Sequence, residues 1–249
     1  MTGTPELQID GHVASIMLRR PAQANRLTPD DLAVLAAHID AVNQRDDVWV
    51  LRLQASGKYF CSGFEIGSIG NGGESGFEQV ADALEDARPV TLALLHGGVY
   101  GGATDLALAC DFRVGTPAAE MFMPAARLGL VFYRRGLERY VSRLGLDQAK
   151  RLFLTAERID ADEMKAIGFL THLVAADELQ ARAQQLTDTL AGMAPIALLA
   201  TKTHLNTLGR GALDVQALAR DQQRAAASAD LREGKAAWVE KRPPRFIGR

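Results

Sequence analysis

The sequence predicts an α/β core followed by a helical tail. Strand-like and helix-like patterns alternate from Leu7 to Val174, and only helical patterns follow from Ala176 onward. An apolar run at 90–95 leads directly into a glycine-rich loop and a helix of small residues. We therefore expect a core over residues 1–192 and a C-terminal helical region over residues 193–249.

The N-terminal elements have clear local signals. Asp10-Gly11 lies between two apolar segments and predicts a hairpin with a type I′ turn. Thr28 is a suitable N-cap and Pro29 suits the first helical position, so a helix is predicted to about Asn43.

The later elements follow from apolar runs and turn residues. Ser68 to Gly76 is polar and glycine-rich and is predicted to be a mobile loop, and a helix is predicted from Gly102 to Ala109. The other predicted strands are 48–53, 90–95, 112–114, 120–123 and 170–174, and the other predicted helices are 77–87, 136–144, 147–154 and 160–167.

Composition restricts the class of protein. The chain has 249 residues, 47% of them hydrophobic, and a formal net charge of −2, so it has no overall basic field to attract nucleic acid. Cys61 and Cys110 lack metal-ligand spacing and are interpreted as reduced cytoplasmic thiols. We find neither a signal peptide nor a membrane span, and we expect a cytoplasmic protein.

The glycine-rich loop at 97–102 is the first candidate site. Its glycines permit a tight turn and a close approach of backbone to a ligand. A strand that leads through such a loop to a helix N-terminus presents free backbone N–H groups, which suits a phosphate or a developing oxyanion. The alternative is a turn that only packs a helix against a sheet.

Motifs spread over nearly the whole chain resemble the crotonase (enoyl-CoA hydratase/isomerase) superfamily. Two glycine loops, each after an apolar strand, are the central feature of the resemblance. The motifs lie at 21–27, 60–66, 96–111, 124–129, 154–161 with 167–170, and 238–246.

The resemblance implies a fold, an assembly and a substrate class. The fold would be a spiral of ββα units with a helical C-terminal part that packs between subunits, in a homotrimer or a dimer of trimers. The substrate would be an acyl-coenzyme A thioester, with no further cofactor and no metal. The backbone N–H groups of Phe64 and Gly102 would form the oxyanion hole. The alternative for Phe64 is a core aromatic residue whose N–H is ordinarily paired.

Asp105 is the candidate acid/base residue. The resemblance places it where hydratases carry a glutamate, in the first turn of the helix after the glycine loop. The alternative is an acid that only stabilises the helix N-terminus. Hydratases carry a second glutamate where this chain has Ala125, so ordinary hydration and one-base isomerisation at that position are both in question.

Tyr133 is the candidate substitute for the missing carboxylate. Its loop and the C-terminal tail resemble methylmalonyl-CoA decarboxylase, whose pocket tyrosine aligns one place earlier, at Phe132. The alternative is a half-buried loop aromatic residue. Arg134 and Arg135 have the chemistry to bind a substrate carboxylate, but we favour solvated side chains or a pair with Glu138.

The resemblance also implies contacts to coenzyme A. Ala24 belongs to the adenine-binding stretch, and Arg26 and Lys241 are candidates to approach a phosphate, or are simply surface cations. His96 is interpreted as a hydrogen-bonded core histidine. The other residues placed along the binding channel or the pocket wall are Ser62, Glu65, Ile66, Tyr100, Gly101, Met123 and Pro124. The alternative for Glu65 is a cap of the next turn.

The sequence therefore predicts an enzyme that processes acyl-CoA and stabilises a thioester enolate. Decarboxylation of a malonyl-type thioester is the first alternative, because it needs the oxyanion hole more than two carboxylates. Hydrolysis of a β-diketone or thioester is a further alternative. A non-catalytic CoA-binding or scaffold protein is the alternative outside enzyme chemistry.

Overall fold

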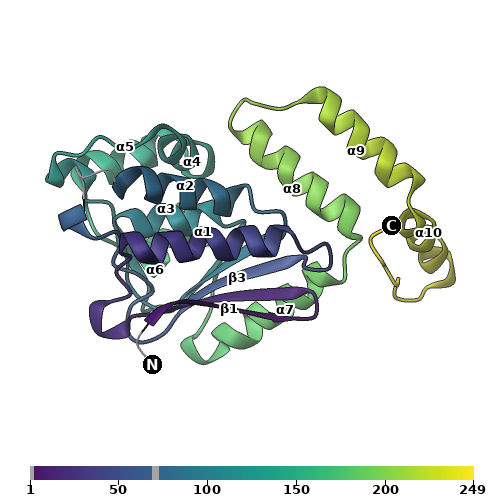
Figure 1. Ribbon diagram of the computed structural model, residues 1–249, viewed down its shortest axis with the longest axis horizontal. Helices are drawn as coiled ribbons and strands as arrows, with labels where there is room; N and C mark the ends of the chain where they lie inside the picture. Colours follow the sequence, from purple (N-terminus) through teal and green to yellow (C-terminus); the bar gives the residue numbers. More distant parts are fainter. Residues whose placement is uncertain (1–2, 69–72) are drawn as a thin grey trace.

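A six-stranded sheet forms the centre of the protein in the computed structural model, which describes residues 3–68 and 73–249 (Figure 1). Its strand order is β1-β2-β3-β4-β6-β9, and every neighbouring pair is parallel except the β1–β2 hairpin. The strands are β1 (Gly3–Asp10), β2 (Val13–Arg19), β3 (Val50–Ala55), β4 (Val90–Leu95), β6 (Phe112–Gly115) and β9 (His172–Leu173).

Helices cover both faces of this sheet. The core helices are α1 (Pro29–Asn43), α2 (Gly73–Glu85), α3 (Gly102–Ala109), α4 (Arg134–Leu144), α5 (Leu146–Thr155), α6 (Ala161–Ala166) and α7 (Leu179–Ala191). Figure 1 shows α1, α2 and α3 on one face and α7 on the other. All of β4 is buried because Ala93 and Leu95 pack in the main core while Leu92 and Leu94 pack with α7.

The hairpin and the first helix form as the sequence predicts, with one correction. Thr28 and Asp31 form a complete capping box at the start of α1. Asp10 pairs directly with Val13, but of the two residues between them only Gly11 has a positive φ, at 53°. A type I′ turn requires positive φ at both central residues, so the predicted turn type is wrong.

A second, three-stranded sheet positions the candidate site. It contains β5 (Val99–Tyr100), β7 (Glu120–Phe122) and β8 (Ile159–Asp160), in the order β5-β7-β8. We predicted β7 but missed the two-residue strands β5 and β8, which are too short to show periodicity. The carbonyl oxygen of Phe122 accepts a hydrogen bond from the N–H of Gly101, which anchors the glycine loop immediately before α3.

Several boundaries differ from the predictions by one or two residues, such as β3 at Val50–Ala55 and α4 at Arg134–Leu144, and two regions differ by more. The loop predicted at Ser68 to Gly76 falls partly on residues 69–72, which lie outside the described residues, and α2 already begins at Gly73. The strand predicted at 170–174 is reduced to β9, which pairs with only two residues of β6. The expected α/β architecture with a helical C-terminal part is confirmed.

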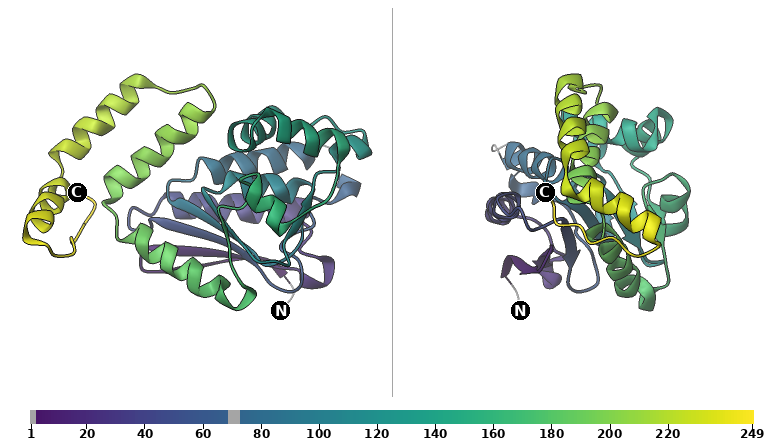
Figure 2. Two further views of the ribbon diagram at one scale, coloured as in Figure 1. Left: turned by 180° about the vertical axis from the view of Figure 1, so that it is seen from behind. Right: turned by 90° about the vertical axis from the view of Figure 1, so that its right-hand side faces the viewer.

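The C-terminal part consists of three helices that extend away from the sheet (Figures 1 and 2). They are α8 (Pro195–Gly209), α9 (Val215–Ala227) and α10 (Ala229–Glu240). Trp238, Val239 and Val215 are exposed on these helices. A domain boundary between residues 192 and 193 stays a prediction. No helix in the described ranges is both long and apolar enough to cross a membrane.

Candidate active site

A cavity of about 560 Å³ lies where the start of α3 meets β7 and the segment before α4. The residues that line it include seven of the predicted site residues, namely Ser62, Phe64, Ile66, Gly101, Gly102, Pro124 and Tyr133. Tyr100 and Met123, which we expected in the pocket wall, also line it. The structure therefore brings both glycine loops and Tyr133 to one cavity.

Phe64 presents a backbone N–H that the neighbouring strand does not use. The N–H of Leu27 donates to the Gly63 carbonyl over 2.9 Å, and the N–H of Glu65 donates to the Leu27 carbonyl over 3.0 Å. In this parallel bridge the N–H of Phe64 points away from Leu27, and it has no acceptor among the described residues. It is therefore available to a ligand in the cavity.

Gly102 presents a second such donor at the N-terminus of α3. The first N–H groups of a helix have no intrahelical acceptor, and that of Gly102 has none elsewhere in the described ranges. A Cβ built on Gly63 would lie 3.3 Å from the Gly102 nitrogen and 2.7 Å from the Tyr100 carbonyl oxygen. Gly63, with φ of 94°, therefore allows the two donor segments to lie side by side.

Asp105 lies behind the pocket wall instead of in it. Its side chain is fully buried and does not line the cavity. Arg139 donates two hydrogen bonds to it, from Nε over 3.0 Å and from Nη2 over 2.7 Å. The hydroxyl of Tyr133 donates a third. Asp105 is thus an acceptor held by two neighbours, and it has no direct contact with the pocket.

Tyr133 is the polar side chain that connects Asp105 to the cavity. It lines the pocket, and its ring stacks on Phe132 with the centroids 4.3 Å apart. Burial and the Asp105 carboxylate raise the pKa of the Tyr133 hydroxyl above its ordinary value. Tyr133 therefore stays neutral at physiological pH, as a hydrogen-bond partner or proton donor and not as a base.

The position expected for the second glutamate carries no acid. Ala125 is buried and lines the pocket as a methyl group. Glu78 on α2, which we did not predict, is the only carboxylate on the described wall, and its side chain has no partner among the described residues. Its position depends on how α2 packs, so no local motif identifies it.

Arg134 and Arg135 do not line the cavity. Arg134 is paired with Glu138 over 2.7 Å, as we favoured from the sequence. For Arg135 the favoured interpretation is wrong, because it pairs with Glu85 over 2.6 Å and with Asp86 over 2.8 Å on a neighbouring part of the chain. Neither arginine is free to bind a substrate carboxylate in this arrangement.

The predicted adenine-binding stretch is bonded to the segment that leads to Phe64. The Ala24 carbonyl accepts a hydrogen bond from the N–H of Ser62 over 2.9 Å. Arg26 pairs with Glu65 over 3.2 Å, and neither side chain lines the cavity. Lys241 is the C-cap residue that follows α10, and it does not line the cavity. His96 is half-buried, with Nε2 lying 2.8 Å from the Gly57 carbonyl oxygen.

Arg139 is the main residue that the sequence interpretation missed. The spacing of Arg135, Arg139 and Arg143 places three arginines on one face of α4, and this signal was available. Isolated charged residues on a helix usually face solvent, yet Arg139 is fully buried. Its burial follows from acids on α2, whose proximity depends on tertiary packing.

Comparisons with known proteins agree with this geometry. The sequence model of the enoyl-CoA hydratase/isomerase family matches residues 8–249. YngF of Bacillus subtilis, assigned by name to the same family, is 31% identical over 250 residues, covering 95% of each chain. Methylmalonyl-CoA decarboxylase of Escherichia coli is 26% identical over 209 residues, covering 80% of each chain. The crystal structure of an enoyl-CoA hydratase from Bacillus anthracis has a TM-score of 0.90 at 26% identity, covering 99% of this chain and 100% of that one.

The chain belongs to the enoyl-CoA hydratase/isomerase family, the crotonase superfamily. It is a member of a family of acyl-CoA enzymes. A hydratase and a decarboxylase resemble it at the same identity of 26%, so similarity alone does not assign the reaction.

Proposed function

We propose that the protein binds an acyl-CoA thioester and stabilises its enolate between the N–H groups of Phe64 and Gly102. The observation that carries this proposal is the pair of unused backbone donors at one cavity, one of them at a helix N-terminus. Negative charge develops on the thioester oxygen during enolate formation. Fixed donors at that position lower the barrier without reorganisation during the reaction.

The groups around this hole favour a reaction that needs one neutral proton donor. Tyr133 reaches the cavity, whereas Asp105 lies behind it and Ala125 offers no carboxylate. Addition of water normally uses two carboxylates that contact the substrate. The described wall offers only Glu78, so Glu78 would have to act without the usual pair.

Decarboxylation of a malonyl-type thioester is the second candidate, and Tyr133 favours it. The bond from the α-carbon to the carboxylate breaks, carbon dioxide leaves, and its electron pair forms the enolate. The Tyr133 hydroxyl then turns from Asp105 towards the substrate and protonates the α-carbon, which is far more basic than a phenolate, and water returns the proton to Tyr133. The described wall has no arginine or lysine to stabilise the substrate carboxylate, which favours its loss.

The oxyanion hole can be tested by removing one N–H group. Phe64→Pro lacks the N–H that faces the pocket but keeps the Gly63 carbonyl and the Glu65 N–H that bond to Leu27. We expect kcat to fall about 10²- to 10³-fold, while Phe64→Ala, which keeps the N–H, loses much less. Equal losses in the two variants would contradict the role of this N–H.

The reaction can be assigned by mass spectrometry of thioester products. The purified protein is incubated separately with crotonyl-CoA and with methylmalonyl-CoA. Loss of carbon dioxide from methylmalonyl-CoA would establish decarboxylation, and a gain of water on crotonyl-CoA would establish hydration and exclude the second candidate. No product from either, with coenzyme A bound, would favour a different acyl group or a binding role.

We also propose a homotrimer or a dimer of trimers in the cytoplasm. Exposed apolar residues on α8 to α10, among them Leu205, Leu208 and Trp238, support burial of these helices against another subunit. Cys61 and Cys110 are free thiols, as expected in a reducing compartment. Sedimentation equilibrium would give the subunit number, and a monomer would contradict the assembly.

A further inference from the structure

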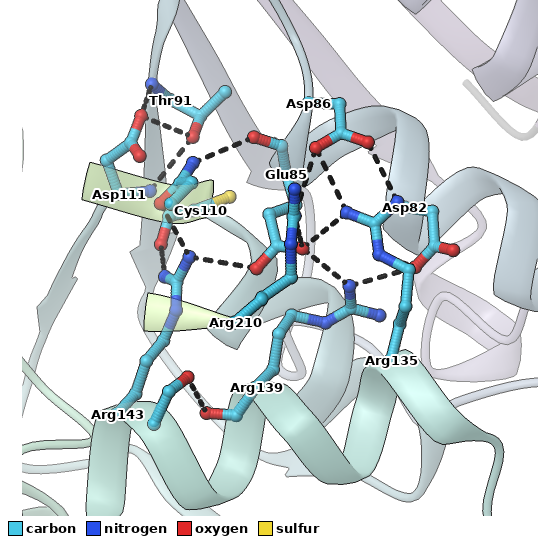
Figure 3. A network of polar contacts seen from close by, with 12 residues as sticks. Asp82, Glu85, Asp86, Thr91, Cys110, Asp111, Arg135, Arg139, Arg143 and Arg210 are labelled. Carbon is cyan, nitrogen blue, oxygen red and sulfur yellow. Dashed lines mark hydrogen bonds and ion pairs between the residues drawn. The ribbon is translucent and has the colours of Figure 1, made fainter. Parts of the chain in front are cut away.

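A buried cluster of charged side chains lies behind the pocket, between α2 and α4 (Figure 3). Three acids lie at or next to the C-terminal end of α2, namely Asp82, Glu85 and Asp86, and three arginines come from α4, namely Arg135, Arg139 and Arg143. Arg210, which follows α8, joins the cluster through a 2.7 Å contact with Glu85. The C-terminal helices therefore contact the layer behind the pocket directly.

Two further side chains of α8 contact the same end of α2. The Nδ2 group of Asn206 donates to the carbonyl oxygen of Glu85 over 3.0 Å. The ammonium group of Lys202 donates to two carbonyl oxygens of the segment that joins α2 to β4, over 2.7 and 2.5 Å. Residues four positions apart share one side of a helix, so Lys202, Asn206 and Arg210 form one polar face that binds the C-terminal end of α2.

Lys202 also binds the C-terminal end of α3. Its ammonium nitrogen lies 3.0 Å from the carboxylate of Asp111, which follows the C-cap of that helix. The same carboxylate accepts the N–H of Thr91 on β4 over 2.7 Å. The side chain of Lys202 is only 6% exposed, and its three N–H donors have three acceptors. One buried cation therefore joins the ends of α2 and α3 to α8.

A second cation supports the same two helix ends from α4. Arg143 donates to the carbonyl oxygen of Cys110 over 2.6 Å and lies 3.4 Å from the carboxylate of Glu85 (Figure 3). The ends are thus held from two sides, by a core helix and by a C-terminal helix. We therefore expect the loss of Lys202 to displace them without unfolding the core.

The opposite ends of α2 and α3 form part of the pocket. α2 contributes Phe77 and Glu78 to the wall, and α3 begins at Gly102, whose N–H is the second proposed donor. A Cβ on Gly102 would lie 2.6 Å from the Phe77 ring, so the two helices are closely packed at this end. α3 has eight residues and is about 12 Å long, so a shift at its C-terminal end also moves the donor.

We propose that Lys202 is a positioning residue that holds α2 and α3 together at their C-terminal ends and so keeps the Gly102 N–H in place for the thioester oxygen. The role of Lys202 rests on the proposed oxyanion hole. The other donor, Phe64, lies on a segment bonded to Leu27 and on neither helix. A shift of α3 therefore changes the distance between the two donors, and a misplacement of about 1 Å can cost much of the catalytic effect.

Acetoacetyl-CoA tests the proposal without turnover. Its enolate absorbs at longer wavelength than adenine and protein, so the absorbance at saturation measures the ratio of bound enolate to bound ketone. We expect the unmodified protein to show this band and Lys202→Met to lower the ratio about 10-fold. Butyryl-CoA does not enolise readily and reports the integrity of the pocket, so its Kd should stay the same in both proteins.

Two variants distinguish positioning from a general loss of stability. Arg210→Gln is the matched control, because Arg210 belongs to the same polar face and is 14% exposed, but its ion pairs are with acids at the end of α2. We expect it to keep the enolate ratio within about 2-fold. Lys202→Arg keeps a cation, and a cavity of about 760 Å³ beside Lys202 and Asp111 has room for the guanidinium. It should recover most of the ratio.

The outcomes separate this proposal from the proposed function. If the unmodified protein binds butyryl-CoA but gives no enolate band, the oxyanion hole itself is wrong, and the role of Lys202 with it. If the band is present and is equal in Lys202→Met, or falls equally in Lys202→Met and Arg210→Gln, only the role of Lys202 is overturned. If Lys202→Met does not fold, Asp111→Ala decides, because it breaks the link to α3 alone: an unchanged ratio overturns the proposal.

Discussion

The wall of the pocket and the layer behind it differ in how they use charge. The described wall carries two backbone donors, apolar side chains, the hydroxyl side chains Ser62, Tyr100 and Tyr133, and a single carboxylate, Glu78, with no arginine or lysine. The layer behind it, between α2 and α4, contains Asp105 and the charged cluster around Arg139. The charges in this layer face one another and not the substrate.

This difference indicates that the two layers have separate roles, since one faces the substrate and the other holds the first in position. Buried charges stabilise a structure only when every partner is present, because each carries a large desolvation penalty. Such a set is rigid, so it can hold a neutral group such as Tyr133 and the start of α3 in fixed positions. In the proposed function the wall itself then needs few charged groups, because the two backbone donors stabilise the enolate and the layer behind the wall holds them in position.

The largest effect is expected from breaking the cluster at Glu85. Glu85→Gln removes one negative charge from four arginine contacts, and we expect the free energy of unfolding to fall by about 3 kcal/mol at neutral pH. Because the pKa of Glu85 lies below 4.5, the stability it contributes is present above that pH. It is lost as the pH falls through the folded-state pKa.

Urea unfolding of the protein and of Glu85→Gln at neutral and acidic pH measures this effect. The two unfolding free energies should converge in acid. Asp86→Asn is the matched control, because Asp86 shares Arg135 and Arg210 with Glu85 but is 49% exposed, and we expect a loss below about 1 kcal/mol. If the difference in unfolding free energy between the unmodified protein and Glu85→Gln does not change with pH, the charge of Glu85 is not the cause of the destabilisation.

The second prediction concerns the backbone donor at the start of α3. A Cβ on Gly102 would lie 2.6 Å from the Phe77 ring, so Gly102→Ala must displace that ring or the donor itself. We expect kcat to fall about 10²- to 10³-fold. Gly102→Ala combined with Phe77→Leu should recover part of the loss. Gly76→Ala on α2 is the control. The added Cβ would meet only Leu32, at 3.6 Å, so kcat should not change.

The third prediction compares two tyrosines on the pocket wall. Tyr133→Phe removes the hydroxyl that is bonded to Asp105 and reaches the pocket, and we expect kcat for decarboxylation to fall about 10²-fold. The Tyr100 hydroxyl is bonded to Glu120 on β7, so Tyr100→Phe should have little effect on kcat. Steady-state kinetics of both variants distinguish a specific role of Tyr133 from a general need for hydroxyl groups in the pocket. Equal effects would favour the general need.

A smaller effect is expected from the single acid of the wall. Glu78→Gln removes a negative charge from the pocket, and we expect KM for methylmalonyl-CoA to fall about 2- to 10-fold as repulsion of its carboxylate is lost. KM for crotonyl-CoA, which has no charge on the acyl group, should not change. If hydration of crotonyl-CoA is instead abolished, Glu78 is a catalytic carboxylate.

The sequence predicted the backbone part of the site because its determinants are local. A buried strand, a glycine loop and a small-residue helix are contiguous at 90–109, and the structure places β4 and α3 there. The capping box of α1 is equally local. Strands β5 and β8 were missed because two residues carry no periodicity and pair only through tertiary contacts.

The charged layer was not predicted because its partners are distant in the chain. Its place in the first turn of the helix after the glycine loop suggested that Asp105 faces the substrate. Arg139, thirty-four residues later in the chain, instead binds it behind the pocket wall. The arginine spacing on α4 shows one face of a helix, yet it does not say whether acids or solvent cover that face. Only the packing of α2 against α4 answers this question.

The smallest effect separates two neighbouring arginines that the sequence alone cannot distinguish. Arg134 is 87% exposed and pairs only within its own helix, so Arg134→Gln should change the free energy of unfolding by less than about 0.5 kcal/mol. Arg135 is 24% exposed and contacts Asp82, Glu85 and Asp86, so Arg135→Gln should destabilise the protein measurably more.

Neither substitution should raise KM for methylmalonyl-CoA, because neither arginine lines the described pocket. Urea unfolding and steady-state kinetics measure the two properties independently. A selective rise in KM for methylmalonyl-CoA in either variant would show that the arginine leaves its acidic partners to bind the substrate carboxylate. The pocket wall and the charged layer would then not be separate where Tyr133 on the wall is followed in sequence by these two arginines.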